Sequence, residues 1–126
     1  YAELAERLIA EGHQVVMAPG PDETELVKSI PGIKLGKPRG FFTWFELAGI
    51  LKRAAFVVGN DTGPTHLASH IGTQGVALFG PYAPAVLTGI ERANFSVIEV
   101  AHLSALPVER VLDEIHLRAA LDRAEA

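Results

Sequence analysis

Three short apolar segments of this chain lack the alternation of apolar and polar residues that marks a half-exposed strand. They span residues 54–58 (AAFVV), 75–79 (GVALF) and 95–100 (FSVIEV). Strands buried on both faces of a parallel sheet have this composition, because helices cover both faces of such a sheet. Predicted helices and buried strands alternate along the chain, so the sequence predicts an α/β fold with a Rossmann-like parallel sheet and helices on both faces.

The first part of the chain repeats the same alternation in shorter elements. An amphipathic helix is predicted from the first residue to Gly12, a good residue to end a helix. A strand over residues 14–18 and a turn over 19–23 follow, and Asp22 with Glu25 resembles a capping box that opens a short helix. Residues 33–35 are then expected to form a short strand. No capping residue precedes the first helix, so we expect the chain to be a fragment of a longer protein.

Two further helices have clear start signals. Thr43 and Glu46 form a capping box before a helix that runs to about residue 53. Pro107 opens a last helix. Its periodicity predicts an inward face of Val108, Val111, Leu112 and Ile115 and an outward face of Glu109, Arg110, Asp113 and Glu114.

Composition excludes several classes of protein. The 126 residues are 48% hydrophobic and 21% charged, which is typical of a folded globular domain. The net charge of −4 with mixed signs argues against a nucleic-acid partner, since such proteins carry a basic face. The chain has no cysteine, so disulfides and thiolate metal sites are excluded. It shows neither an apolar run long enough to span a bilayer nor a signal peptide, and the cytoplasm is the simplest expectation.

The most informative segment is FVVGNDTGPTHLA at residues 56–68, a predicted strand, loop and helix start. In an α/β sheet, ligands bind at the carboxyl ends of the strands, where this loop lies. Gly59 and Gly63 allow close backbone approach, and Pro64 suits the first helical position. The start of a helix attracts anions, and three N–H groups are predicted to be free for a phosphate: those of Thr65, His66 and Leu67.

Side chains of this loop complete the predicted phosphate site. The hydroxyl of Thr62 can donate to a phosphate oxygen, and His66 can add a donor or a positive charge. Asp61 is expected to accept from sugar hydroxyls or to orient Thr62 and the loop. The alternatives are a plain turn between strand and helix, or a metal site of Asp61, His66 and His70. Ser69 lies in no nucleophile elbow, so a hydrolase has no support.

The string DTGPTHLA resembles the signature of glycosyltransferase family nine, the ADP-heptose:lipopolysaccharide heptosyltransferases. The resemblance extends through ELAERLIAEGHQVVMAPGPDETEL, FELAGILKRAAFVVGNDTGPTHLASHIGT and VALFGP, and covers roughly Tyr1 to Pro81. It implies a two-domain GT-B enzyme of which this chain, residues 1–126, is the C-terminal, donor-binding domain without its first strand. The implied reaction is transfer of heptose from ADP-heptose to the lipopolysaccharide inner core.

The resemblance also assigns site residues by motif position. Glu23 would bind the ribose hydroxyls, while Phe42 and Thr43 would line the adenine pocket. Without the resemblance, Glu23 could equally be a carboxylate at a helix start, and Phe42 a core residue. The diphosphate and sugar of the donor would be bound by Asp61, Thr62, Gly63, Pro64, His66 and Leu67.

Other implied features lie outside this chain. The N-terminal domain, with the catalytic carboxylate and the acceptor site, is absent, so no residue here is assigned as catalytic, and no metal or cofactor is expected. The full-length protein would act at the cytoplasmic face of the inner membrane, with possible association with the membrane surface. Gln74 replaces the usual proline, and the segment after Val100 is short. The basic residues Lys34, Lys37 and Arg39 could meet an anionic acceptor or the donor, or form a solvated loop.

Two alternative functions stay open at this point. The chain could act only as a nucleotide-binding module without activity of its own. It could also belong to a GT-B transferase or epimerase that uses another nucleotide sugar.

Overall fold

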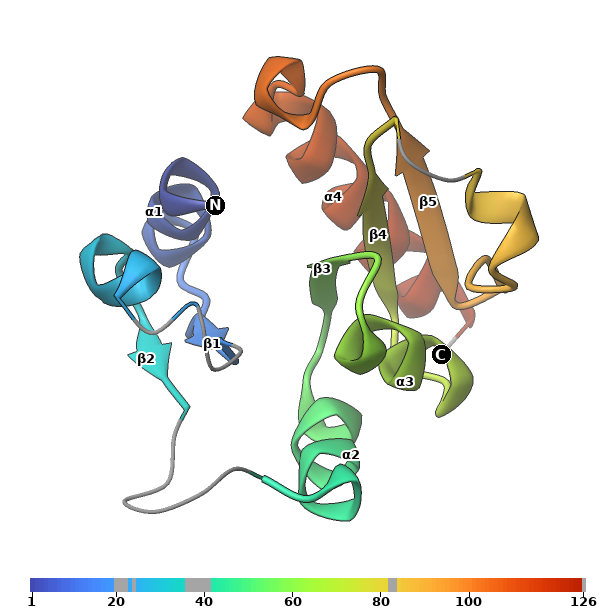
Figure 1. Ribbon diagram of the computed structural model, residues 1–126, viewed down its shortest axis with the longest axis horizontal. Helices are drawn as coiled ribbons and strands as arrows, with labels where there is room; N and C mark the ends of the chain where they lie inside the picture. The colour runs from blue at the N-terminus through green and yellow to red at the C-terminus, as the bar shows by residue number, and fades with distance from the viewer. Residues whose placement is uncertain (20–22, 24, 36–41, 82–83, 126) are drawn as a thin grey trace. The chain divides into compact units, whose positions relative to one another are not determined.

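The computed structural model describes residues 1–19, 23, 25–35, 42–81 and 84–125 (Figure 1). The chain divides into two compact units, Tyr1–Phe42 and Thr43–Ala126, which are described separately. Both units pair their strands in parallel and combine them with helices, so the predicted α/β class is confirmed.

The first unit holds helix α1 (Ala2–Ala10), strand β1 (Val16–Met17), the 3-10 helix η2 (Leu26–Ser29) and strand β2 (Ile33–Lys34). The first helix ends as predicted, and Gly12 follows it with a φ of +94°, a conformation that glycine adopts at no steric cost. The predicted helix start at Asp22 lies outside the described residues.

Strand β1 is shorter and more exposed than the apolar run at 14–18 predicts. Val16 is 46% exposed, so the prediction of a buried strand is wrong at this position. Among the described strands β1 pairs with β2 alone, and a two-residue ladder leaves much of the strand uncovered.

The second unit contains a parallel sheet of β3 (Val57–Asn60), β4 (Gly75–Phe79) and β5 (Phe95–Glu99), in the order β3-β4-β5. The positions of β4 and β5 agree with the sequence prediction. Strand β3 begins at Val57 rather than at Ala54, because Ala54 is still the C-cap of the preceding helix and its N–H donates to the Leu51 carbonyl. All residues of β3 are partly buried, whereas full burial was expected.

Helices α2 (Trp44–Arg53), α3 (Gly63–His70) and α4 (Val108–Glu125) accompany this sheet, with the 3-10 helices η3 (Ala85–Leu87) and η4 (Leu103–Ala105). The predicted capping box is present at the start of α2. The Glu46 amide donates to Thr43 Oγ1 at 3.2 Å, and the Thr43 amide donates to Glu46 Oε1 at 2.9 Å. This reciprocal pair satisfies two N–H groups that a helix start otherwise leaves open.

The core of the second unit lies on both faces of β4, whose five residues are all buried. Figure 1 shows α3 and α4 on opposite faces of the sheet. Because successive side chains of a strand point to opposite faces, alternate residues of β4 and β5 contribute to different layers. The cluster that includes α3 contains Ala68, Ala77, Phe79, Ala85, Ile90 and Phe95.

The inward face of α4 agrees with the prediction at Val111, Leu112 and Ile115, which are buried. Glu114 does not follow it, because its side chain is only 15% exposed and turns toward β5. Its Oε1 accepts a 2.5 Å hydrogen bond from Ser96 Oγ, and Arg118 Nε donates to the same hydroxyl at 2.6 Å. A polar partner on the sheet therefore draws in a residue that periodicity places outside.

In the part of the chain that the structure describes, no helix has the length and apolar character needed to cross a membrane.

Candidate functional site

The loop between β3 and α3 lies at the carboxyl edge of the three-stranded sheet (Figure 1). Strand β3 ends at Asn60, and α3 begins at Gly63. Pro64 is therefore the second residue of the helix, whereas the sequence predicted it to be the first. The N-cap residue Thr62 makes no side-chain hydrogen bond to the helix amides. An uncapped helix start at this edge presents N–H groups and the positive end of the helix dipole.

The amides that remain open differ from those predicted. The His66 N–H donates to the Thr62 carbonyl at 3.1 Å, so the prediction of a free amide at His66 is wrong. The α-helical ladder continues from there and also uses the Leu67 amide. Since Pro64 has no N–H, the amides that precede the ladder are those of Gly63 and Thr65.

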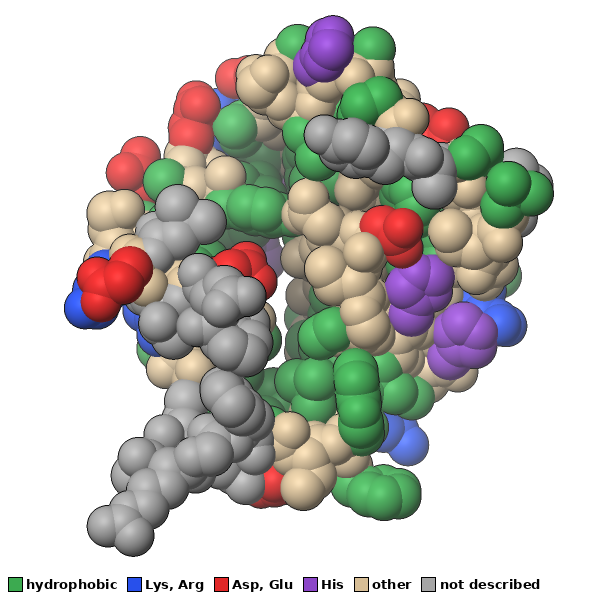
Figure 2. All heavy atoms as spheres, viewed as in Figure 1, with side chains coloured by type: hydrophobic (Ala, Val, Ile, Leu, Met, Phe, Trp, Pro, Cys, Tyr) green, Lys and Arg blue, Asp and Glu red, His purple; other side chains and the backbone are tan. Residues whose placement is uncertain are grey.

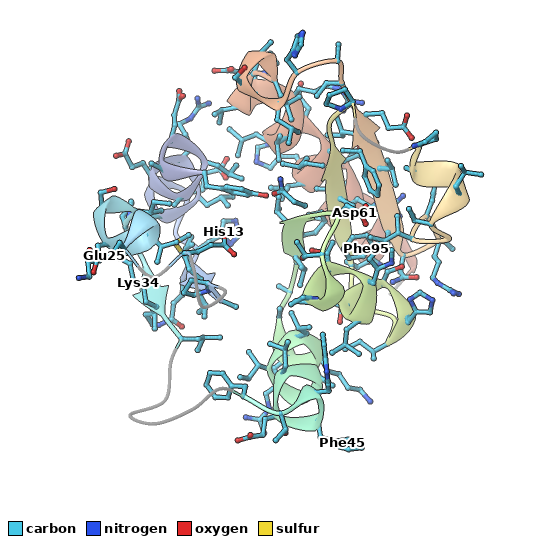
Figure 3. The ribbon with its side chains drawn as sticks, in the orientation of Figure 1. His13, Glu25, Lys34, Phe45, Asp61 and Phe95 are labelled. Carbon is cyan, nitrogen blue, oxygen red and sulfur yellow. The ribbon has the colours of Figure 1, made fainter. Side chains whose placement is uncertain are left out.

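Asp61 and His66 form a close pair at this helix start. His66 Nε2 lies 2.7 Å from Asp61 Oδ1, and the two side chains are 29% and 42% exposed. A carboxylate can only accept a hydrogen bond, so Nε2 is the donor and the imidazole is held in one orientation. Asp61 therefore contacts His66, a partner that sequence reasoning did not assign. Figure 3 labels Asp61 beside the start of α3.

Figure 2 shows an acidic side chain beside histidine side chains on one face of the molecule, in agreement with the pairing of Asp61 and His66. His70 lies one turn further along the helix, and its Nδ1 is 2.8 Å from the His66 carbonyl oxygen. The described residues contain no group of three or more His, Asp or Glu side chains that could hold a metal ion. The Asp61, His66 and His70 arrangement is therefore a hydrogen-bonded chain and does not form a cluster of ligands.

A buried threonine packs against the residues of this loop. Thr65 is 3% exposed, and its Oγ1 lies 3.1 Å from the Oγ1 of Thr62. A Cβ on Gly59 would come within 2.2 Å of Thr65 Oγ1, so this threonine fits only against a glycine. If the Thr65 hydroxyl donates, the Thr62 hydroxyl keeps its own hydrogen for a phosphate oxygen. The spacing of the two threonines, one helical turn apart, is the signal that could have identified this pair.

Helix α2 contributes an aromatic side chain to the same loop. A Cβ on Gly63 would come within 2.7 Å of Trp44 Cη2, so the indole reaches the first residue of α3. Trp44 is nevertheless 61% exposed. Sequence reasoning missed this contact, because it depends on how α2 packs against α3.

The remaining predicted residues are found in several places. Thr43 caps α2 and so lies next to Trp44, whereas Phe42 and Glu23 belong to the first unit. Partial burial, and to a lesser degree the negative charge of Glu23, raise the pKa of the Tyr1 hydroxyl to about 12. Glu23 therefore lies near Tyr1 within that unit.

Of the predicted basic residues, the structure describes Lys34, whose Nζ donates to the Gly32 carbonyl at 3.0 Å. Lys37 and Arg39 lie outside the described residues.

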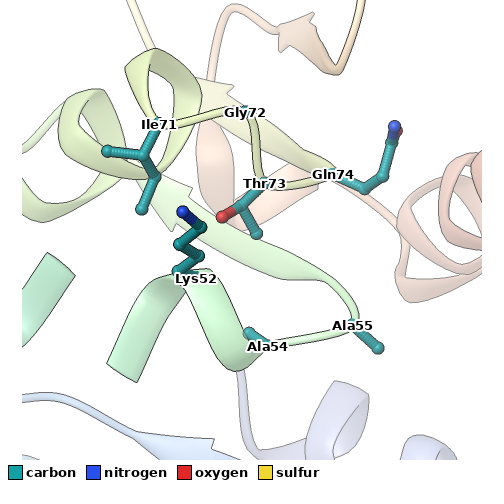
Figure 4. Close-up of a pocket in the computed structure, with 7 residues that line it drawn as sticks. All are labelled: Lys52, Ala54, Ala55, Ile71, Gly72, Thr73 and Gln74. Carbon is teal, nitrogen blue, oxygen red and sulfur yellow. The ribbon is translucent and has the colours of Figure 1, made fainter. Parts of the chain in front are cut away.

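Two shallow cavities in the second unit lie at opposite edges of the sheet. One, of about 330 Å³, is at the amino ends of β3 and β4 (Figure 4), away from the predicted site. It is lined by Lys52, Ala54, Ala55, Ile71, Gly72, Thr73 and Gln74. The other, of about 350 Å³, is at the carboxyl ends of β4 and β5 and is lined in part by Gly80, Pro81 and Glu99. The second cavity lies on the edge where α/β proteins bind ligands.

Comparisons with known proteins point to one family. The family model of glycosyltransferase family 9 (heptosyltransferase) matches residues 1–113. Lipopolysaccharide heptosyltransferase 2 of Salmonella typhimurium is 30% identical over an alignment that covers 92% of this chain. Lipopolysaccharide heptosyltransferase 3 of Escherichia coli is 27% identical over 64% of it.

Solved structures agree with this result. The E. coli ADP-heptose lps heptosyltransferase II superposes with a TM-score of 0.81 at 25% identity, over 100% of this chain and 41% of that one. A glycosyl transferase family 9 protein from Veillonella parvula gives 0.79 at 23% identity, over 93% of this chain and 40% of that one, and shows the same fold. The chain spans 40% of the length of heptosyltransferase 2 and 25% of the length of heptosyltransferase 3. With the family model matched over most of its residues, this chain belongs to glycosyltransferase family 9, the heptosyltransferase family.

Proposed function

We propose that this chain is the donor-binding part of a GT-B heptosyltransferase that transfers heptose from ADP-heptose to the lipopolysaccharide inner core. The observation that carries this proposal is the uncapped start of α3 at the carboxyl edge of the sheet, with His66 held beside it by Asp61. The curated relatives are named lipopolysaccharide heptosyltransferases, which supports heptose as the transferred sugar and lipopolysaccharide as the acceptor. The solved E. coli relative, named ADP-heptose lps heptosyltransferase II, supports ADP-heptose as the donor.

The diphosphate of the donor binds where positive partial charge is concentrated. The amides of Gly63 and Thr65 and the dipole of α3 attract one phosphate. Because the His66 Nε2–H already donates to Asp61, His66 donates to the phosphate only through Nδ1, when the imidazole carries both protons. The Thr62 hydroxyl supplies a second donor. Asp61, as an acceptor, keeps the imidazole in place and is available to sugar hydroxyls on its second oxygen.

In this reaction the acceptor hydroxyl attacks the anomeric carbon of the heptose, and the bond to the diphosphate breaks. Negative charge then grows on the leaving diphosphate, and the donors at α3 stabilise it more strongly than in the ground state. The base that removes the acceptor proton belongs to the N-terminal domain of the full-length protein. This site therefore binds the donor and its leaving group. We further propose that the full-length protein acts at the cytoplasmic face of the inner membrane.

Titration calorimetry with ADP and UDP tests this proposal on the chain itself. We expect ADP to bind and UDP to bind more weakly. A clear preference for UDP would exclude ADP-heptose as the donor and favour a transferase or epimerase that uses another nucleotide sugar.

Two substitutions test the site. His66→Ala removes the imidazole beside the phosphates, and Asp61→Ala releases it from its fixed orientation, so each is expected to raise the Kd for ADP by roughly tenfold, or about 1.4 kcal/mol. His70→Ala is the matched control, because His70 lies one turn away and is exposed. Unchanged affinity in both site variants, with intact circular dichroism spectra, would mean that the phosphates bind elsewhere.

A further inference from the structure

We propose that Trp44 provides the stacking face for the base of the nucleotide whose diphosphate binds at α3. This inference rests on the proposed function and adds a specificity-determining residue to the same site. It follows from a contact between two helices and from the exposure of the indole.

The indole is fixed at one end and open at the other. Its Cη2, Cζ3 and Cζ2 atoms would lie 2.7, 3.5 and 3.6 Å from a Cβ on Gly63, so the far edge of the ring contacts the backbone at the start of α3. The side chain is still 61% exposed. Trp44 is also the first residue of α2, whose start is held by the capping box of Thr43 and Glu46. Both the backbone and the ring edge of Trp44 are therefore held in place.

Exposure alone does not distinguish Trp44, since Phe45 is more exposed; the distinguishing feature is that the exposed indole is held against Gly63. A typical surface side chain is not held by a contact with another helix, as the edge of this indole is by Gly63. A typical core side chain is covered on both faces of its ring, whereas most of this indole is exposed. A flat ligand that stacks on the open part of the ring accounts for both observations, because stacking requires a rigid aromatic face that is free on one side.

The position of the ring selects the nucleotide base as that ligand. A phosphate at the Gly63 and Thr65 amides lies next to the edge of the indole, because the same Gly63 backbone contacts both. Among the parts of a nucleotide sugar, the base alone has an extended π face. Each base stacked on an aromatic side chain typically contributes enough to change affinity by roughly tenfold or more.

The neighbouring residue supplies a matched control. Phe45 is 92% exposed and directs its ring away from α2 (Figure 3). Adjacent helix residues face different directions, so Phe45 shares the exposure and the aromatic character of Trp44 without its contact to Gly63. Trp44 is the one tryptophan of the chain, so intrinsic fluorescence reports on this position alone.

The test compares ADP with inorganic pyrophosphate, which has the phosphates and lacks the base. Binding of both is measured by calorimetry on the 126-residue chain and on Trp44→Leu, Trp44→Phe and Phe45→Leu. We expect Trp44→Leu to weaken ADP by roughly tenfold and to leave pyrophosphate within about twofold. Trp44→Phe should recover most of the ADP affinity, and Phe45→Leu should change neither ligand. In the unsubstituted chain, saturating ADP should quench the fluorescence more than saturating pyrophosphate does.

Several results would overturn this inference. Equal weakening of ADP and pyrophosphate in Trp44→Leu would mean that the indole shapes the phosphate site only. Unchanged ADP affinity in Trp44→Leu, or equal quenching by the two ligands, would mean that the base lies elsewhere. If neither ligand binds the unsubstituted chain, the proposed function fails, and this inference falls with it. Circular dichroism of each variant separates loss of binding from loss of folding.

Discussion

The contact between Gly59 and Thr65 allows a quantitative test of how the loop is built. In Gly59→Ala, the new Cβ would lie 2.2 Å from Thr65 Oγ1, and 3.2 and 3.3 Å from the Cβ and Cγ2 atoms of the same residue. Rotation of Thr65 can move the oxygen, but it breaks the 3.1 Å hydrogen bond to Thr62. The two carbon contacts stay tight, because Thr65 is buried and has little room to shift.

These terms give an estimate for the free energy of unfolding. Overpacking of a buried site costs about 1–3 kcal/mol, and loss of the hydroxyl hydrogen bond costs about 0.5–1.5 kcal/mol. Replacement of glycine by alanine in a strand returns about 0.5–1 kcal/mol through the unfolded state. Gly59→Ala should therefore destabilise the chain by about 2 kcal/mol, the sum of these typical magnitudes.

A double-mutant cycle isolates the contact. Thr65→Ala alone should destabilise by about 1–2 kcal/mol, since it removes the hydroxyl and a buried methyl group. In the double variant the new Cβ occupies the space that Oγ1 has left, so the total loss should be at least about 1 kcal/mol smaller than the sum of the single losses. Urea unfolding followed by circular dichroism measures all four proteins. Additive losses within about 0.5 kcal/mol would refute the proposed packing.

Three further substitutions give expected shifts in the same unfolding assay. Gly75→Ala should be more damaging than Gly59→Ala, because its Cβ would lie 2.5 Å from the Val57 backbone oxygen inside the sheet, and an equal or smaller loss would contradict this packing. Gly49→Ala should stabilise α2 by about 0.5–1 kcal/mol, since nothing lies within 4 Å of its Cβ position, and any loss would argue against the helix as described. Thr43→Ala should lower the free energy of unfolding by about 1 kcal/mol, because it removes the capping box. Thr43→Ser keeps the hydroxyl and should retain most of this stability.

The sequence predicted most accurately those elements whose position is fixed by a local pattern of residues. Strand β4 is apolar throughout and is buried throughout, and the capping box of α2 is a local pattern of Thr43 and Glu46. The start of β3 was placed too early, because apolar Ala54 and Ala55 suit a strand as well as the exit from a helix. Local sequence gives the type of an element more surely than its boundaries.

At the candidate site, too, local sequence predicted some features, whereas others depend on tertiary contacts. The motif led to the loop and to Asp61 and His66, yet the contact between these two depends on side-chain directions that spacing alone does not supply. The fit of Thr65 under Gly59, and of Trp44 on Gly63, depends on tertiary packing. Each of these contacts joins a residue of the motif to a neighbour whose importance becomes visible only in three dimensions.

The parallel order of β3, β4 and β5 has a consequence for how the second unit folds. Val57 pairs with Gly75, and Gly75 pairs with Phe95, so each ladder must close a loop that contains helical structure before its first hydrogen bond forms. No two of these strands form a hairpin that could nucleate the sheet locally, and chains with such distant pairings fold slowly. Since α3 lies within the loop that joins β3 to β4, closure of that ladder and formation of the helix start should occur in one kinetic step. We therefore expect the loop between β3 and α3 to appear late in refolding, together with the sheet.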